Sequence, residues 1–134
     1  MSELTEIDHV AIAVHDLEAA IAYYRDTFGA EVTYREVVER DGVEEALLRV
    51  ADSYIQLLTP VRDDSPVAKS LASRGEGLHH VGYRVADCAA ALARVKAEGH
   101  RVIDEEPRPG SRGTTVAFLH PTSAFGTLIE LVQE

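Results

Sequence analysis

The chain is poor in several residue types that would otherwise decide its class. Its single cysteine, Cys88, cannot form an intramolecular disulfide, and tryptophan is absent. Basic side chains are also scarce, because 13 Lys and Arg stand against 23 Asp and Glu and give a net charge of −10. An acidic chain without a Lys/Arg run repels nucleic acid and anionic membranes. We therefore expect neither as a partner.

Long apolar runs are missing too. No stretch approaches the roughly 20 residues needed to cross a bilayer. The opening sequence MSELTEIDHV has no basic segment followed by a long apolar one, as a secretory signal would have. Together with the lone cysteine, these absences favour a cytoplasmic protein. The length of 134 residues suits one domain, which we expect to span residues 1–134.

What the chain does contain is an internal repeat. EIDHVAIAVHD near the N-terminus returns as GLHHVGYRVAD, and an offset of 71 residues places His9 on His80 and Asp16 on Asp87. Each Asp is a suitable N-cap for the helically spaced apolar residues that follow it. The β-branched stretches that come next are EVTYREVV, EEALLRV and SYIQLLTP in the first copy, and HRVIDEE, TTVAFLH and TLIELVQ in the second. Each copy therefore predicts a β-α-β-β-β module.

Two such modules predict an α+β fold. The expected parts are module one at about 5–60, a connector helix at about 65–75 and module two at about 78–133. Ser65 is the expected N-cap of the connector helix, and Gly75 follows its end. Because the strands of one copy cannot close a sheet alone, we expect the copies to pair into one curved eight-stranded sheet with the helices outside.

Four polar residues interrupt otherwise apolar strands: His9, Gln56, His80 and Glu130. They occupy the first and last strands of the two copies, since an offset of 74 residues places Gln56 on Glu130. One such residue alone would be a satisfied core residue or an edge position. Four of them at equivalent positions indicate a shared site instead. Two imidazoles, an amide and a carboxylate suit a divalent ion of Mn, Fe, Co, Ni or Zn.

These residues and several longer motifs resemble the methylmalonyl-CoA epimerases, a family of the vicinal oxygen chelate superfamily. The resemblance runs from DHVAIAV to LIELVQ, and its most specific pieces are DSPVAK, RGEGLHHV, DEEPRPG and FLHP. It implies two paired modules around a metal ion held by His9, Gln56, His80 and Glu130. The ion it implies is Co²⁺, with Mn²⁺, Ni²⁺ or Zn²⁺ as alternatives, and it also implies a homodimer.

The activity that the resemblance implies is the interconversion of (2R)- and (2S)-methylmalonyl-CoA by 1,1-proton transfer through a metal-stabilised enolate. The catalytic glutamate of the family lies in a Gly-Val-X-Glu stretch, which is GVEE here and ends at Glu45; the family often has Gln before that glycine, where this chain has Asp41. Inversion needs an acid and a base on opposite faces of the planar intermediate, and Glu130 is the second candidate. The strand period places Glu45 and its neighbour Glu44 on opposite faces.

Three alternatives stay open. Another acyl-CoA epimerase, such as an ethylmalonyl-CoA epimerase, would share every motif. A glyoxalase I-like lyase would use the same fold, although it usually has Glu where Gln56 stands. A non-catalytic small-molecule-binding protein of this fold would have no need of four metal ligands. The nucleotide end of CoA is anionic, so the candidates to bind its phosphates are Lys69, Arg74, Arg108 and Arg112, the last two in the loop EEPRPGSRGTT.

Overall fold

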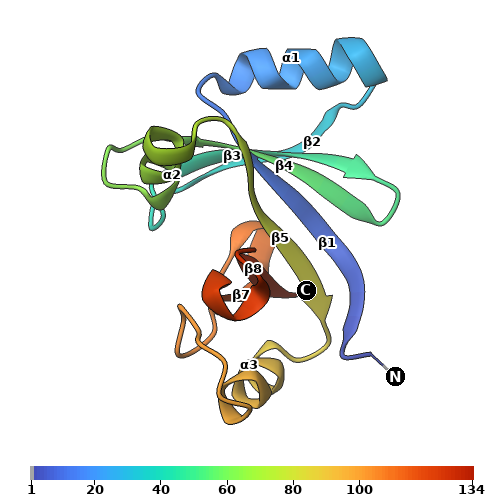
Figure 1. Ribbon diagram of the computed structural model, residues 1–134. Helices are drawn as coiled ribbons and strands as arrows, with labels where there is room; N and C mark the ends of the chain where they lie inside the picture. The colour runs from blue at the N-terminus through green and yellow to red at the C-terminus, as the bar shows by residue number, and fades with distance from the viewer. Residues whose placement is uncertain (1) are drawn as a thin grey trace. The chain divides into compact units, whose positions relative to one another are not determined.

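The computed structural model describes residues 2–134, and Met1, the first residue of the predicted domain, lies outside them. Within the described residues the order of elements is a β-α-β-β-β module, a connector helix and a second β-α-β-β-β module (Figure 1). The strands are β1 Leu4–Ala13, β2 Val32–Val38, β3 Val43–Val50, β4 Ser53–Pro60, β5 Gly77–Val85, β6 Arg108–Pro109, β7 Thr115–Leu119 and β8 Ile129–Gln133. The α-helices are α1 Leu17–Phe28, α2 Pro66–Arg74 and α3 Cys88–Ala97, and the short 3-10 helices are Ser111–Gly113 and Pro121–Ala124. The α+β class and the predicted module order are confirmed.

The chain divides into two compact units. One is the Val10–His79 unit, and the other, the His80–Glu134 unit, also includes the residues up to His9. Strand β1 contributes residues to both. The prediction of a single domain stays a prediction. None of the helices in residues 2–134 combines the length and apolar character that a bilayer-spanning helix requires.

In the Val10–His79 unit the strands follow the order β2-β3-β4-β1, and β3 pairs antiparallel with both β2 and β4. Helix α1 packs on one face, where its apolar side contacts Ala46, Leu48 and Leu57. Helix α2 packs on the side of the sheet that carries Val43 and Leu58. Since side chains alternate along a strand, this second face is the one on which Glu45 and Gln56 lie.

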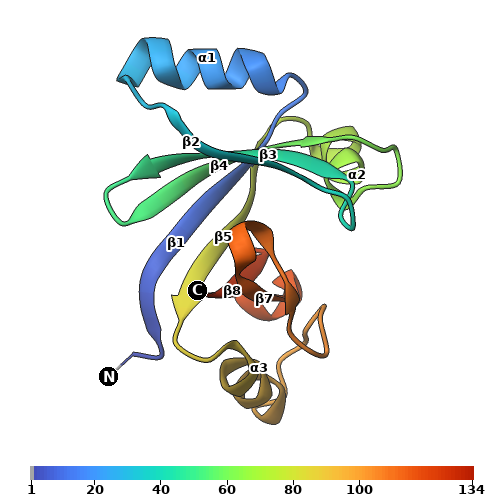
Figure 2. The ribbon, with the colours of Figure 1, turned by 180° about the vertical axis from the view of Figure 1, so that it is seen from behind.

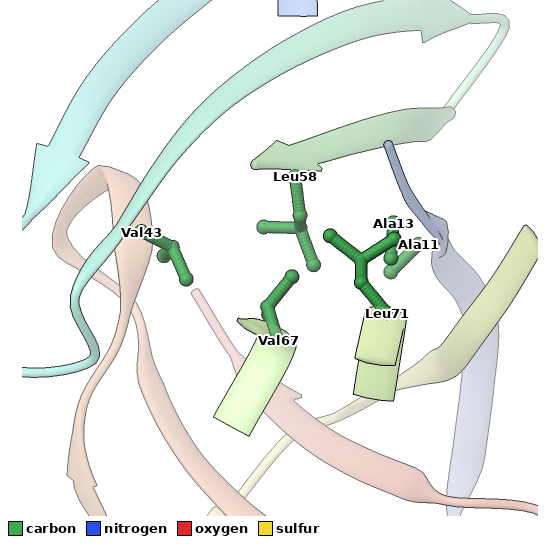
Figure 3. Packing of buried hydrophobic residues seen from close by; sticks show 6 residues of the cluster. All are labelled: Ala11, Ala13, Val43, Leu58, Val67 and Leu71. Carbon is green, nitrogen blue, oxygen red and sulfur yellow. The ribbon is translucent and has the colours of Figure 1, made fainter. Parts of the chain in front are cut away.

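Figure 3 shows how α2 reaches that face, with the side chains of Val67 and Leu71 directed at Leu58 and at Ala11 and Ala13 of β1. All six residues of this cluster, which also includes Val43, are buried. The predicted capping explains where the helix begins and ends. The Ser65 side chain accepts a hydrogen bond from the Ala68 backbone N–H, and Gly75 follows the last turn.

In the His80–Glu134 unit the order is β1-β5-β8-β7-β6, with β5 and β8 parallel and β7 and β8 antiparallel. Helix α3 lies beside β7 and β8 (Figure 1, Figure 2). It buries Cys88 and Leu92 against Ala117 and Leu131. The alternation of strand residues therefore turns Glu130 to the face away from α3.

One predicted strand is wrong. The stretch HRVIDEE, residues 100–106, forms an isolated bridge between Val102 and Leu119 and a few backbone hydrogen bonds to residues 118–120 instead of a strand. Strand β6 is the short Arg108–Pro109 pair farther along. The physical reason is competition for the β7 backbone. The Asp104 carboxylate accepts the Phe118 backbone N–H at 2.8 Å, which a ladder partner would otherwise bond. The two prolines of the EEPRPG segment also lack the N–H that a ladder needs.

Candidate metal centre and active site

His9, His80 and Glu130 meet in the His80–Glu134 unit. Nε2 of His9 lies 2.9 Å from Nε2 of His80 and 2.9 Å from Oε1 of Glu130. Nε2 of His80 lies 3.1 Å from the same carboxylate oxygen. The three residues are buried, and one ligand atom from each lies within 4.8 Å of the others. Two imidazole nitrogens and a carboxylate oxygen converging on one point fit a divalent metal ion.

The pairing of β5 with β8 creates this convergence. Gly82 is the Cα partner of Glu130, and His80 lies two residues earlier on the same face of β5. A Cβ at Gly82 would lie 2.3 Å from Cε1 of His9, so the missing side chain is the space that the His9 ring occupies. On the other side of β8, Phe118 pairs with Glu130 and sets its ring edge-on to His80, with centroids 5.2 Å apart.

Asp8 completes the cluster, and the sequence analysis missed it. Its carboxylate is fully buried, and Oδ2 lies 2.7 Å from Nδ1 of His9. A carboxylate on Nδ1 keeps the proton there and leaves Nε2 as the ligand atom, which is the usual arrangement behind a metal-bound histidine. The available signal was an acidic residue directly before His9 inside an apolar strand.

Two arginines also contact Asp8. Oδ1 of Asp8 accepts hydrogen bonds from Arg84 Nη2 at 2.8 Å and from Arg112 Nη2 at 2.7 Å. Arg112 is one of the residues predicted to bind the CoA phosphates, and in the structure its side chain is directed at Asp8 and Glu134. Arg108, the other candidate of this loop, lies over the Phe118 ring at 5.4 Å.

The electrostatics of the cluster favour positive charge between its carboxylates. Burial alone would raise the pKa of Asp8, yet hydrogen bonds from His9, Arg112 and Arg84 hold it well below its ordinary value. Burial would lower the pKa of His9, but hydrogen bonds to Asp8 and Glu130 raise it to about 9. Burial would raise the pKa of Glu130, and the two histidines lower it to about 2. Burial lowers the pKa of His80. A divalent cation would supply the positive charge that this arrangement favours.

Glu45 and Gln56 form a second polar pair, within the Val10–His79 unit. Glu45 is fully buried on β3, and its Oε1 accepts a hydrogen bond of 2.7 Å from Nε2 of Gln56 on β4. Because the amide nitrogen is used in this way, the Gln56 oxygen is available; it is buried and accepts no hydrogen bond from the described residues. Glu44 lies on the opposite face, as the strand period predicts, and pairs with Arg35 at 2.8 Å.

The structure thus brings together three of the predicted site residues as one cluster, and Glu45 and Gln56 as another.

Residues 8–118 match the Glyoxalase/Bleomycin resistance protein/Dioxygenase superfamily. An ethylmalonyl-CoA/methylmalonyl-CoA epimerase of Cereibacter sphaeroides is 43% identical over 95% of this chain and 96% of the relative. The human mitochondrial methylmalonyl-CoA epimerase is 37% identical over 97% of this chain and 74% of the relative.

A solved structure of a methylmalonyl-CoA epimerase in complex with methylmalonyl-CoA and NH₄⁺ is 48% identical, with a TM-score of 0.95 over 98% of this chain and 95% of that chain. The chain belongs to the methylmalonyl-CoA epimerase family. The predicted resemblance is therefore confirmed, and so is the vicinal oxygen chelate fold. Membership in this epimerase family also disfavours the glyoxalase I-like and non-catalytic alternatives.

Proposed function

We propose that the chain is an isomerase that interconverts (2R)- and (2S)-methylmalonyl-CoA. The observation that carries the proposal is the buried cluster of His9, His80 and Glu130 in a chain of this epimerase family. A 1,1-proton transfer beside a thioester carbonyl needs a cation to stabilise the developing negative charge, together with positioned acid and base groups. The chain has candidates for each.

His9, His80 and Glu130 are the proposed ligands of a divalent ion, and Gln56 is the proposed fourth ligand. Its buried amide oxygen, which accepts no hydrogen bond from the described residues, supports that role. We propose Co²⁺ as the ion, with Mn²⁺, Ni²⁺ and Zn²⁺ as the alternatives that a mixed nitrogen and oxygen donor set accepts. When bound, the ion supplies Lewis acidity that makes the proton next to the thioester carbonyl easier to remove.

Glu45 is the proposed base on one face of the substrate. Its carboxylate is buried, and the Gln56 amide fixes one of its oxygens by donating a hydrogen bond. Glu130 is the proposed group on the opposite face, through the carboxylate oxygen that does not bind the ion. Because the histidines lower its pKa to about 2, this oxygen first takes a proton from solvent and then gives it to the same carbon. For the other epimer the two carboxylates exchange roles. Positioned acid and base groups of this kind contribute about 10² to 10⁴ in rate.

Substrate assays test the proposal. Purified protein loaded with Co²⁺ should interconvert the methylmalonyl-CoA epimers. The change in circular dichroism as the epimers equilibrate, or exchange of the α-proton in deuterated water, measures this reaction. Ethylmalonyl-CoA belongs in the same assay, because a 43% identical relative is named for both substrates. The glutathione hemithioacetal of methylglyoxal is the negative control. Turnover of the hemithioacetal alone would overturn the proposal.

We further propose that the protein works as a homodimer in the cytoplasm with an acyl-CoA as its small-molecule partner. The family resemblance supports the dimer, and sedimentation at micromolar concentration measures it. Because the human relative is named as mitochondrial, fractionation of cells that express the full-length protein is the direct test of its compartment.

A further inference from the structure

The hydrogen bond between Asp8 and His9 needs outside support. Successive side chains on a strand leave opposite faces of the sheet, so the Asp8 carboxylate reaches its neighbour's ring only when it is turned toward it. Oδ2 nevertheless lies 2.7 Å from Nδ1 of His9. The other oxygen, Oδ1, is bound by two guanidinium groups, and Asp8 is fully buried. One carboxylate oxygen thus orients the histidine, and the other is held by the arginines.

Arg84 reaches Asp8 along the sheet. It donates to Oδ1 through both Nε, at 3.0 Å, and Nη2, at 2.8 Å, so its contact with the carboxylate has little freedom to rotate. Nη1 of Arg84 lies 3.0 Å from the Glu6 carboxylate, which fixes the outer end of the same side chain.

Arg112 reaches Asp8 from a tight loop between β6 and β7. Its backbone is left-handed, with φ 44° and ψ 35°, a conformation that is unfavourable for a residue with a Cβ. Hydrogen bonds of the neighbouring backbone hold the loop closed, because Gly110 N–H donates to Thr114 O and Thr114 N–H to Ser111 O. Gly110 leaves no room for a side chain, since a Cβ there would lie 2.6 Å from Cγ1 of Val116.

We propose that Arg112 and Arg84 are positioning residues of the metal centre. They hold the Asp8 carboxylate in the orientation that fixes the proton of His9 on Nδ1 and presents His9 Nε2 to the ion. The strained loop serves to deliver Arg112 to this carboxylate. The inference rests on the proposed metal site, and it adds residues that act on that site through Asp8.

Titration of the metal-free full-length chain with Co²⁺ tests the inference without any activity measurement. Arg112→Ala should weaken Co²⁺ binding by about 10- to 100-fold, the usual cost of losing a group that orients a metal ligand. It should also shift the visible absorption of bound Co²⁺, because the His9 ring is freer. Arg112→Lys should recover part of the affinity, since an ammonium group donates to Oδ1. Arg94→Ala is the control, because Arg94 pairs with the exposed carboxylates of Glu3 and Glu98.

A double substitution distinguishes positioning from general damage to the loop. If Arg112 acts through Asp8, adding Arg112→Ala to Asp8→Asn should weaken Co²⁺ binding by less than two-fold further. A full additional loss in the double variant, or unchanged affinity in Arg112→Ala, would overturn the inference. Circular dichroism checks folding. If Arg112→Ala is unfolded, Arg112→Met replaces it, because methionine keeps a long side chain but has no hydrogen-bond donor. Absence of Co²⁺ binding by the unmodified protein would instead reject the proposed function.

Discussion

His9 and His80 occupy equivalent positions in the two copies of the repeat, but their surroundings differ. His9 is hydrogen bonded to the Asp8 carboxylate, and its pKa is raised to about 9. The His80 ring meets the edge of Phe118, and burial lowers the pKa of His80. The repeat therefore places both imidazoles, and the carboxylate beside His9 and the aromatic ring beside His80 give them different surroundings.

The last strands of the two copies show the same divergence. Glu130 contributes a carboxylate to the histidine cluster, whereas its counterpart Gln56 is a neutral amide that donates to Glu45. With one ligand carboxylate instead of two, a bound dication would keep net positive charge. The duplicated fold thus supplies positions, and the substitutions within it supply an asymmetric chemistry.

Removing one of the paired histidines should have the largest effect. His80→Ala leaves His9 and Glu130 as the remaining candidate ligands of the cluster, so the protein should lose both binding of added Co²⁺ and epimerase activity. The loss of metal affinity should be larger than the loss of about 10- to 100-fold that is typical when a group that only orients a ligand is removed. Metal analysis of the purified variant and the epimerisation assay measure it. Full metal content and turnover in this variant would exclude the cluster as the metal site.

The second prediction concerns the two adjacent glutamates of β3. Glu45→Gln keeps the shape of the buried side chain and removes the proposed base, so epimerisation should fall by about 10² or more. Glu44→Gln is the matched control and should change little, because Glu44 faces away and pairs with Arg35.

Proton exchange in deuterated water refines this second test. With each epimer supplied separately, a group surviving on the opposite face could still exchange the α-proton of one epimer without inverting it. Labelling should therefore become unequal between the epimers in Glu45→Gln. Equal loss of labelling for both would indicate failed substrate or metal binding, and near-normal inversion would show that Glu45 is not the base.

A smaller effect should follow from replacing Gly82 of β5 by alanine, the residue found at the equivalent position, Ala11, of β1. The offset of the repeat places Gly82 on Ala11. Gly82→Ala would put a Cβ within 2.9 Å of three atoms of the His9 ring, so the ring must move and Co²⁺ affinity should fall by about 10-fold. Overpacking should also cost about 1–3 kcal/mol of stability, measured by denaturant unfolding. Ala11→Gly, in the apolar cluster, should cost about 1 kcal/mol and leave Co²⁺ binding unchanged.

The smallest change in rate should come from making Gln56 a carboxylate like Glu130. Gln56→Glu should preserve or tighten Co²⁺ binding. It should slow turnover, but by a smaller factor than the fall of about 10² expected for Glu45→Gln. An added anion offsets the Lewis acidity of the ion, and the donor to Glu45 is lost. Metal content and rate measured on the same preparation should therefore diverge. Unchanged turnover would mean that the neutral amide is not needed for electrophilicity.

The sequence predicted the parts of the site that depend on local period and on repetition. The offset between the copies found the paired histidines. Strand alternation placed Glu44 and Glu45 on opposite faces, and the family motif singled out Glu45, which is the buried one. Asp8 escaped prediction because its partner Arg112 is 104 residues away, and only the folded chain brings them together. The stretch of residues 100–106 escaped for a related reason. Its β-branched residues indicate a strand, but the Asp104 side chain takes the backbone donor of Phe118.

The buried thiol of Cys88 has a practical consequence for labelling chemistry. Burial raises its pKa to about 11, so the reactive thiolate is scarce near neutral pH. Because this is the chain's single cysteine, a second one placed at an exposed position would react almost alone with a maleimide probe. Tyr23 on α1 is 56% exposed and offers such a position, so Tyr23→Cys would carry a fluorophore or spin label with the native thiol left in place.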